Sequence, residues 1–156
     1  MCQPGESRFA FASASQAQTS PCKVSSDDTN GACTILEFNA LPRSGPFLHV
    51  HHREDEWYYV LSGEFVFRAG AEEHNLATGA SIWLPRGIPH VGANTATTEG
   101  KLILMCQPGG FEKFFHKMGK VPMDKKNPET MRDLMGLSME MLGPPIFVAS
   151  WMQQHS

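Results

Sequence analysis

Short runs of apolar and β-branched residues, typical of β-strands, fill the middle of the chain. They occupy residues 33–38, 47–51, 57–61, 65–68, 80–84, 89–92 and 101–106. Gly, Pro and Asn residues separate many of them, as expected for turns between strands. No helical pattern interrupts the series to provide the crossovers that parallel strands need. The sequence therefore predicts an all-β fold, either a sandwich or a barrel.

Helical patterning is predicted only near the C-terminus. Residues 111–118 carry apolar side chains at 111, 114, 115 and 118, which is the spacing of one helix face. Asn127 followed by Pro128 predicts the start of a second helix. We expect this helix to run to about Leu142, where Gly143 and two prolines end it. Residues 147–151 fit either a last strand or an anchored tail.

The length and composition favour one folded core. The chain has 156 residues, and no change in composition divides it into two self-sufficient halves. We predict a loose N-terminal arm over residues 1–20, a β-barrel over 21–110 and a helical extension over 111–156 that packs on the barrel. The arm and the methionines of the second helix are candidate contacts with a second copy of the chain, so we expect a homodimer.

Charge and hydropathy exclude several classes of partner. The formal net charge is -3, and Lys and Arg gather only modestly between residues 117 and 126, which argues against a nucleic-acid partner. No apolar run approaches the roughly 20 residues of a membrane span, and residues 1–20 lack the features of a signal peptide. These patterns predict a cytoplasmic protein whose partner is a small molecule.

Histidines gather in two of the strand-like runs. Residues two apart on a strand point to the same face, so His49 and His51 can both reach one metal ion, whereas His52 points the opposite way. The polar residues that follow reset the strand, and Glu56 then opens the next run as a third candidate ligand. Glu54 and Asp55 compete for that role on residue type alone. His90, on a later run, is the fourth candidate.

The spacing of these residues resembles the two sequence motifs of the cupin family. The first block reads His49-x-His51-x4-Glu56-x6-Gly63, and Gly45 is a candidate for its leading glycine. The second block reads Gly79-x5-Pro85-x-Gly87-x2-His90-x3-Asn94. Many fixed residues at fixed spacing are hard to obtain by chance, which makes this signal much stronger than an isolated pair of histidines.

The cupin resemblance implies a double-stranded β-helix, the jelly-roll cupin barrel, here with C-terminal helices. It also implies that His49, His51, Glu56 and His90 hold one divalent transition metal. Three imidazoles and one carboxylate leave open positions on an octahedral ion, and they suit Fe, Mn, Ni, Cu or Zn without distinguishing among them. Phe47, Tyr58 and Val60 share strand faces with these ligands and are candidates for a substrate pocket, or equally for an ordinary barrel core.

Residues 46–65, 85–90 and 109–112 resemble the small bacterial cupins of the quercetin 2,3-dioxygenase-like type. That resemblance implies a metal-dependent dioxygenase acting on a flavonol-like or other small aromatic or enolizable substrate, with Glu56 as both ligand and catalytic base. Two alternatives stay open because one fold hosts many activities. They are another cupin enzyme, such as a sugar isomerase, epimerase or decarboxylase, and a non-enzymatic module that binds or senses a small ligand.

Overall fold

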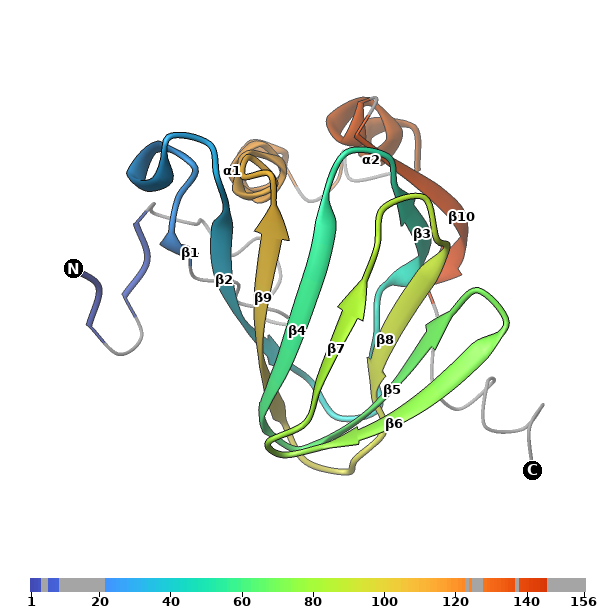
Figure 1. The fold of residues 1–156 in the computed structure, drawn as a ribbon. Coiled ribbons are helices and arrows are strands. Elements are labelled where there is room, and N and C mark those ends of the chain that lie inside the picture. Colours follow the sequence, from blue (N-terminus) through green and yellow to red (C-terminus); the bar gives the residue numbers. More distant parts are fainter. Residues whose placement is uncertain (4–5, 9–21, 123, 125–127, 137, 146–156) are drawn as a thin grey trace.

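Two antiparallel sheets form most of the protein. The computed structural model describes residues 1–3, 6–8, 22–122, 124, 128–136 and 138–145. The first sheet has the order β1 (Cys22–Val24), β2 (Thr34–Ala40), β9 (Gly100–Gln107), β4 (Asp55–Ser62) and β7 (Ser81–Leu84). The second has the order β10 (Met139–Pro145), β3 (Phe47–His51), β8 (His90–Asn94), β5 (Glu64–Ala69) and β6 (Glu72–Ala77). The predicted all-β class and its double-stranded β-helix are confirmed (Figure 1).

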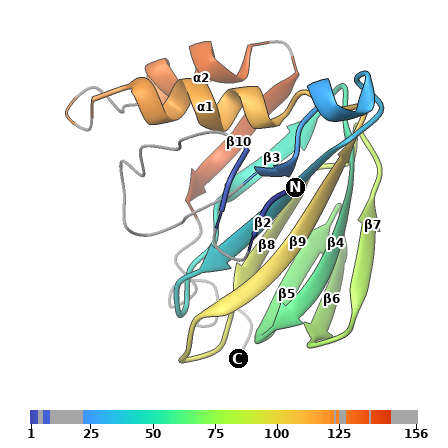
Figure 2. The ribbon, with the colours of Figure 1, turned by 90° about the vertical axis from the view of Figure 1, so that its left-hand side faces the viewer.

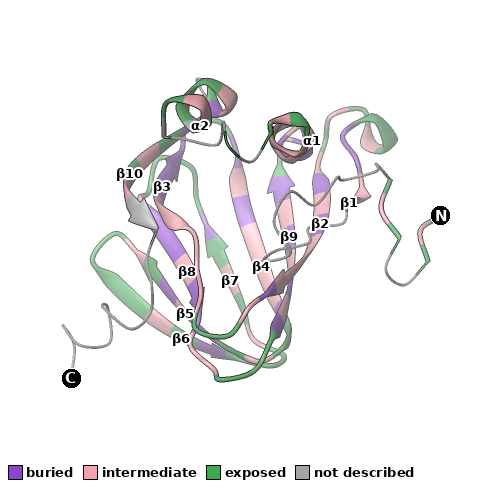
Figure 3. Ribbon diagram, turned by 180° about the vertical axis from the view of Figure 1, so that it is seen from behind, coloured by how far each residue is buried: buried purple, intermediate pink, exposed green. Residues whose placement is uncertain are grey.

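The inner faces of the two sheets pack against each other and form the core. Val60 of β4 and Leu102 of β9 belong to one buried cluster with Phe65 and Phe67 of β5, so this cluster joins the two sheets. The burial alternates along the strands: in β9, Leu102, Leu104 and Cys106 are buried. Figure 3 shows buried positions on strands of both sheets. This alternation is the reason that period-two patterning predicted the strands.

Two helices lie over one end of the sheets (Figures 1 and 2). They are α1 (Glu112–Lys120) and α2 (Pro128–Met135), and a short 3-10 helix, η1 (Asp27–Thr29), joins β1 to β2. Phe111 and Met135 pack in a second core cluster with Leu36, Leu104 and Cys106 from the first sheet. None of the helices in the described part of the chain has the length and apolar character to cross a membrane.

The predicted second helix is too long. It ends at Met135, and residues 139–145, which we expected to be partly helical, form strand β10. Gly136 has a φ of 58°, a left-handed conformation that commonly ends a helix. Met139 then pairs with His51 and Met141 with His49, so β10 satisfies the open edge of β3. Residues 9–20 of the predicted arm and residues 147–151 lie outside the described residues.

Candidate metal centre

Four side chains from both sheets converge in the interior. His49 and His51 come from β3, His90 from the adjacent β8, and Glu56 from β4 of the opposite sheet. His49 and His90 are direct register partners, which brings their rings to a centroid distance of 4.5 Å. One ligand atom from each of the four residues lies within 4.8 Å of the others, and all four residues are buried. The structure thus brings together the four residues predicted as ligands.

The hydrogen bonds of His49 and His90 fix which ring nitrogen faces the centre. In each residue Nδ1–H donates to the backbone oxygen two residues earlier, Phe47 for His49 and Ile88 for His90, at 2.9 Å in both cases. Each ring therefore turns Nε2 toward the other ligands. Histidines that bind metals commonly use one nitrogen as the ligand and the other as a donor in this way.

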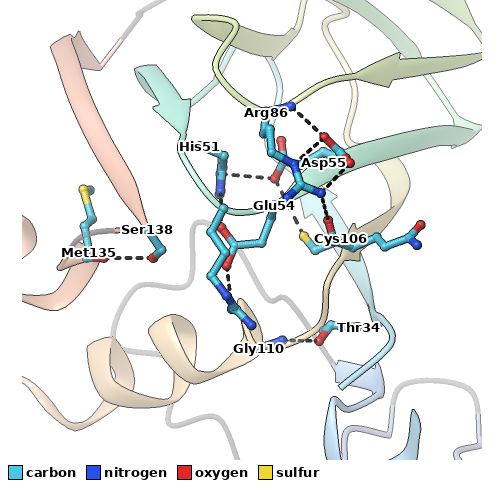
Figure 4. Close-up of polar contacts among 12 residues, drawn as sticks. Thr34, His51, Glu54, Asp55, Arg86, Cys106, Gly110, Met135 and Ser138 are labelled. Atoms are coloured by element: carbon cyan, nitrogen blue, oxygen red, sulfur yellow. Dashed lines mark hydrogen bonds and ion pairs between the residues drawn. The ribbon is translucent and has the colours of Figure 1, made fainter. Parts of the chain in front are cut away.

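The surroundings of His51 are the strongest indication that a metal ion binds among the four residues. Its ring is completely buried, and Nδ1–H donates to Glu54 Oε2 at 3.3 Å (Figure 4). The opposite nitrogen, Nε2, lies 3.3 Å from Glu56 Oε1 but has no hydrogen-bond partner. In the neutral ring the proton is on Nδ1, so Nε2 presents a lone pair and cannot donate to the Glu56 carboxylate despite the short distance. A buried lone pair without a partner is costly, and a metal ion would satisfy it.

The spacing of the donor atoms fits one ion. Nitrogen and oxygen atoms bound to one transition metal at about 2.1 Å lie about 3 to 4 Å apart. Glu56 Oε2 is 2.8 Å from His90 Nε2, and Glu56 Oε1 is 3.3 Å from His51 Nε2. All four donor atoms lie within 4.8 Å of one another, so the most separated pair would approach by about 1 Å to close the set around an ion.

The electrostatics of the group also favour a cation. Burial lowers the pKa of His49 to about 4, which keeps its imidazole neutral and available as a ligand. Burial alone would raise the pKa of Glu56, but the three histidines lower it to about 2, so this carboxylate is ionised. For His51, burial opposes the charged form, yet Glu56 and Glu54 raise its pKa. The two carboxylates therefore hold negative charge around the ring nitrogens.

A cavity of about 290 Å³ adjoins the group, and His49 and Glu56 reach its wall. Of the three residues predicted for a substrate pocket, Phe47 and Tyr58 line this cavity, whereas Val60 is fully buried in the core and is not among the lining residues. The aromatic part of the wall consists of Phe38, Phe47, Tyr58, Phe65, Phe67, Phe111, Phe114 and Phe115. No Lys or Arg of the described residues contributes to the lining. The cavity is therefore mainly apolar, with its charge at the metal-ligand end.

Two acidic residues beside Glu56 point elsewhere. Asp55 accepts hydrogen bonds from the Arg86 guanidinium, the shortest at 2.7 Å, and this pairing lowers the pKa of Asp55 to about 2. Glu54 is 1% exposed and contacts His51 from behind. Neither belongs to the converging group, so of the three neighbouring carboxylates only Glu56 can be a ligand. Sequence reasoning considered Glu54 only as a competing ligand and missed its contact with His51.

The α1 segment contributes a wall of the cavity that the sequence did not predict. Phe111, Phe114 and Phe115 line the cavity, and the Phe111 ring meets His51 edge-on at a centroid distance of 4.8 Å. The helical spacing of these residues indicated one apolar face, but nothing in the spacing indicated that this face closes a ligand cavity.

Comparison with known proteins supports the same fold. Residues 38–106 match the family model described as "Cupin domain". No curated protein sequence matches the chain. TT1209 from Thermus thermophilus has a similar structure, with 29% identity and a TM-score of 0.54, covering 60% of this chain and 85% of that one.

Two other solved structures are similar. A predicted oxalate decarboxylase from Thermotoga maritima has 25% identity and a TM-score of 0.55, covering 58% of this chain and 80% of that one. KdgF from Halomonas sp. has 15% identity and a TM-score of 0.56, covering 63% and 84%, and supports the fold alone. Together, the family match over residues 38–106, the fold and the converging ligand group support the cupin superfamily.

Proposed function

We propose that this chain is a metal-dependent oxygenase that acts on a small aromatic or enolizable substrate. One observation carries the proposal: the partnerless Nε2 of buried His51 belongs to a ligand group at the end of an aromatic cavity. A bound divalent transition metal would polarise a substrate oxygen and, if redox-active, would allow reaction with dioxygen. The proposed ligands are His49, His51, Glu56 and His90, with one ion per chain.

The polar groups of the cavity support an apolar substrate with one polar end. The Asn94 amide donates to the backbone oxygens of Ala40, Leu41 and Thr98. The Ser44 hydroxyl donates to the Leu41 oxygen, and the Tyr58 hydroxyl donates to Glu56 at 3.4 Å. These groups already have partners, so a ligand would find its main polar contact at the metal-ligand end. Its remaining atoms would lie against aromatic rings, which suit a flat substrate.

Glu56 is the residue that we propose as the base. Its carboxylate is ionised, since its pKa is lowered to about 2, and it lies on the wall of the cavity beside the other ligands. One oxygen can accept a proton from an enolizable substrate while the other remains a ligand. The Tyr58 hydroxyl is within reach of the same carboxylate and would stabilise the ionised form. Burial raises the pKa of Tyr58 well above 10.0, so this residue donates a hydrogen bond rather than acting as a phenolate.

Oxygen uptake tests the proposal directly. Metal-free protein would be loaded separately with Fe(II), Mn(II), Ni(II), Cu(II) and Zn(II), then mixed with a panel of flavonols and other enolizable aromatic compounds. The proposal expects uptake with at least one redox-active metal and none with the Glu56→Ala variant. Uptake with no combination of metal and substrate would refute the oxygenase. A bound aromatic ligand without turnover would instead favour a binding or sensing module.

Decarboxylation is the second candidate, favoured by the similarity to the predicted oxalate decarboxylase of Thermotoga maritima at 25% identity. The cavity argues for the first candidate, because the described lining residues offer no Lys or Arg to pair with a free carboxylate. Carbon dioxide release from oxalate, measured with the same metal series, distinguishes the two. The homodimer and the cytoplasmic location expected from the sequence remain predictions, and light scattering on the purified protein tests the first.

A further inference from the structure

We propose that Glu54 is a positioning residue for the metal centre, where its carboxylate orients His51 and strengthens it as a ligand. The inference rests on the metal binding proposed above. It assigns a function to a buried carboxylate that is not itself a ligand. Glu54 is 1% exposed, and a glutamate is rarely fully buried unless it is paired, so the groups that pair with it indicate its role.

The three histidines differ in the group behind them. Nδ1–H of His49 and of His90 each donates to a neutral backbone oxygen. Nδ1–H of His51 instead donates to the Glu54 carboxylate at 3.3 Å. A carboxylate behind a ligand histidine fixes the proton on the outer nitrogen and makes the inner nitrogen more basic. His51 is also the histidine whose inner nitrogen has no hydrogen-bond partner. The same ring therefore has a carboxylate at its outer nitrogen and an inner nitrogen available to a metal.

Glu54 is held in place from its other side. Its Oε1 accepts a hydrogen bond from Arg53 Nη1 at 3.0 Å, and Arg53 Nη2 donates to the backbone oxygen of Gly109 at 3.1 Å. Gly109 lies just before α1, whose Phe111 packs edge-on against His51. The ring is thus fixed by a carboxylate on one edge and an aromatic side chain on another. With one oxygen committed to Arg53, Glu54 directs the other oxygen toward His51.

Two substitutions separate the effects of orientation and charge. Glu54→Gln keeps the size and an acceptor oxygen but removes the charge. Glu54→Met keeps the approximate length and removes both the charge and the acceptor oxygen. Asp55→Asn is the matched control, since it removes one negative charge from the next residue, which pairs with Arg86 and contacts no ligand histidine.

The measurement is zinc affinity by competition with a chelator, with zinc alone as the probe. Loss of groups that support ligand histidines typically weakens metal affinity by 10–100-fold, so we expect a loss of about 10-fold for Glu54→Gln and about 100-fold for Glu54→Met. Asp55→Asn is expected to stay within about threefold of wild type. Thermal unfolding of the metal-free variants accompanies the titrations, and Glu54→Gln provides the test if Glu54→Met fails to fold.

A second readout follows the proton on Nδ1 of His51, which donates its hydrogen bond to Glu54. In proton–nitrogen spectra of the zinc-loaded protein, the Nδ1–H of His51 should be visible in wild type and in Glu54→Gln, and should exchange with water in Glu54→Met. A residue that only fills space would leave this signal unchanged. Zinc affinities of both Glu54 variants within about threefold of wild type would overturn the inference, as would an equal loss in Asp55→Asn. A wild-type protein that binds no zinc or other divalent metal would overturn the proposed function as well.

Discussion

Glu112 offers the most quantitative test of how the cavity wall is held. It is the first residue of α1 and is 1% exposed. One carboxylate oxygen accepts hydrogen bonds from the backbone nitrogen and the hydroxyl of Ser26, at 2.9 and 2.5 Å. The other accepts from the Thr34 hydroxyl and, at 3.0 Å, from the backbone nitrogen of Gly110. Four donors from three segments therefore meet on one carboxylate, directly beside the Phe111 that lines the cavity.

The expected cost of Glu112→Gln follows from these bonds. The amide keeps one oxygen for Ser26 and presents an NH2 group to the other pair. Gly110 N–H stays paired, because it also donates to the Thr34 hydroxyl oxygen at 3.0 Å, and Thr34 can accept from the new amide. Two things are lost: the acceptor of the Thr34 hydroxyl hydrogen, and the charge assistance of the remaining bonds, since bonds to ionised groups are roughly twice as strong as neutral ones. We expect a loss of about 2 kcal/mol in the free energy of unfolding for Gln and about 4 kcal/mol for Glu112→Ala.

The pH dependence provides an internal check on this reasoning. The hydrogen bonds from Ser26 and Thr34 outweigh burial and lower the pKa of Glu112 from its ordinary value of 4.5. A lowered folded-state pKa contributes stability above the unfolded-state pKa, and this stability is lost as the pH falls through the folded-state value. The difference between wild type and Glu112→Gln should therefore be largest near neutral pH and shrink below about 4.5.

Urea unfolding at a series of pH values measures both quantities. Glu99→Gln is the control, because Glu99 is exposed and its neutralisation should change stability by less than about 0.5 kcal/mol. A Glu112→Gln variant within about 0.5 kcal/mol of wild type at neutral pH would contradict the energetic argument. A difference that stays constant into the acid range would show that the charge is not the cause.

Three further outcomes test the site and the core. Glu56→Gln should lower the metal content of dialysed protein, measured by elemental analysis, because it removes the single carboxylate among the converging donors; unchanged content would exclude Glu56 as a ligand. Metal content of wild type should fall as the pH drops through and below the ordinary imidazole value of about 6.5, first through His51, whose pKa is raised, and last through His49, whose pKa burial lowers to about 4; full occupancy at about pH 4 would argue against histidine ligation. Gly92→Ala would place a Cβ 2.4 Å from the Phe67 ring, so we expect a loss of about 1–3 kcal/mol in thermal or urea unfolding.

The strands that the sequence predicted best are those with one fully buried face. In β9, apolar residues alternate with a burial pattern of the same period, so the amphipathic signal is complete. β6 was missed because its residues are mostly polar and only Leu76 is buried. Its pairing with β5 satisfies backbone groups, which apolar periodicity does not report. β1, with the three residues Cys22–Val24, is too short to show any period.

The error at β10 has a similar cause. Met139, Glu140 and Met141 continue a helical spacing from α2, but they also fit a strand, in which Met139 is buried, Glu140 exposed and Met141 partly buried. A short methionine-rich run fits either period, and the open edge of β3 decides the outcome. The pairing with β3 therefore selects the strand over residues 139–145, and only the arrangement of the whole sheet contains that information. The end of α2 did have a local signal, Gly136, which the helical spacing of the methionines outweighed.

Among the site residues too, some positions follow from the local strand pattern and others depend on how distant strands pack. Strand parity alone placed His49 and His51 on one face, and the structure agrees. Glu56 followed from the reset of the strand after His52, with Glu54 and Asp55 as competitors, and His90 rested chiefly on motif spacing, because their approach depends on how two sheets face each other. The contact of Glu54 with His51 depends on the bend over residues 52–54, whose geometry no residue pattern specifies.

The residues that line the cavity and the residues that would hold the metal are partly different, so metal binding and substrate choice can be altered separately. Phe47 and Phe115 line the cavity without being ligands, whereas His51 belongs to the ligand group and is not part of the lining. Apolar walls distinguish substrates weakly, by about 10- to 200-fold for each methylene group. A smaller residue at Phe115 should therefore widen the range of aromatic ligands while leaving metal content unchanged. A change at His51 should reduce both metal content and the affinity for every ligand, because each of them would depend on the same ion for its polar contact.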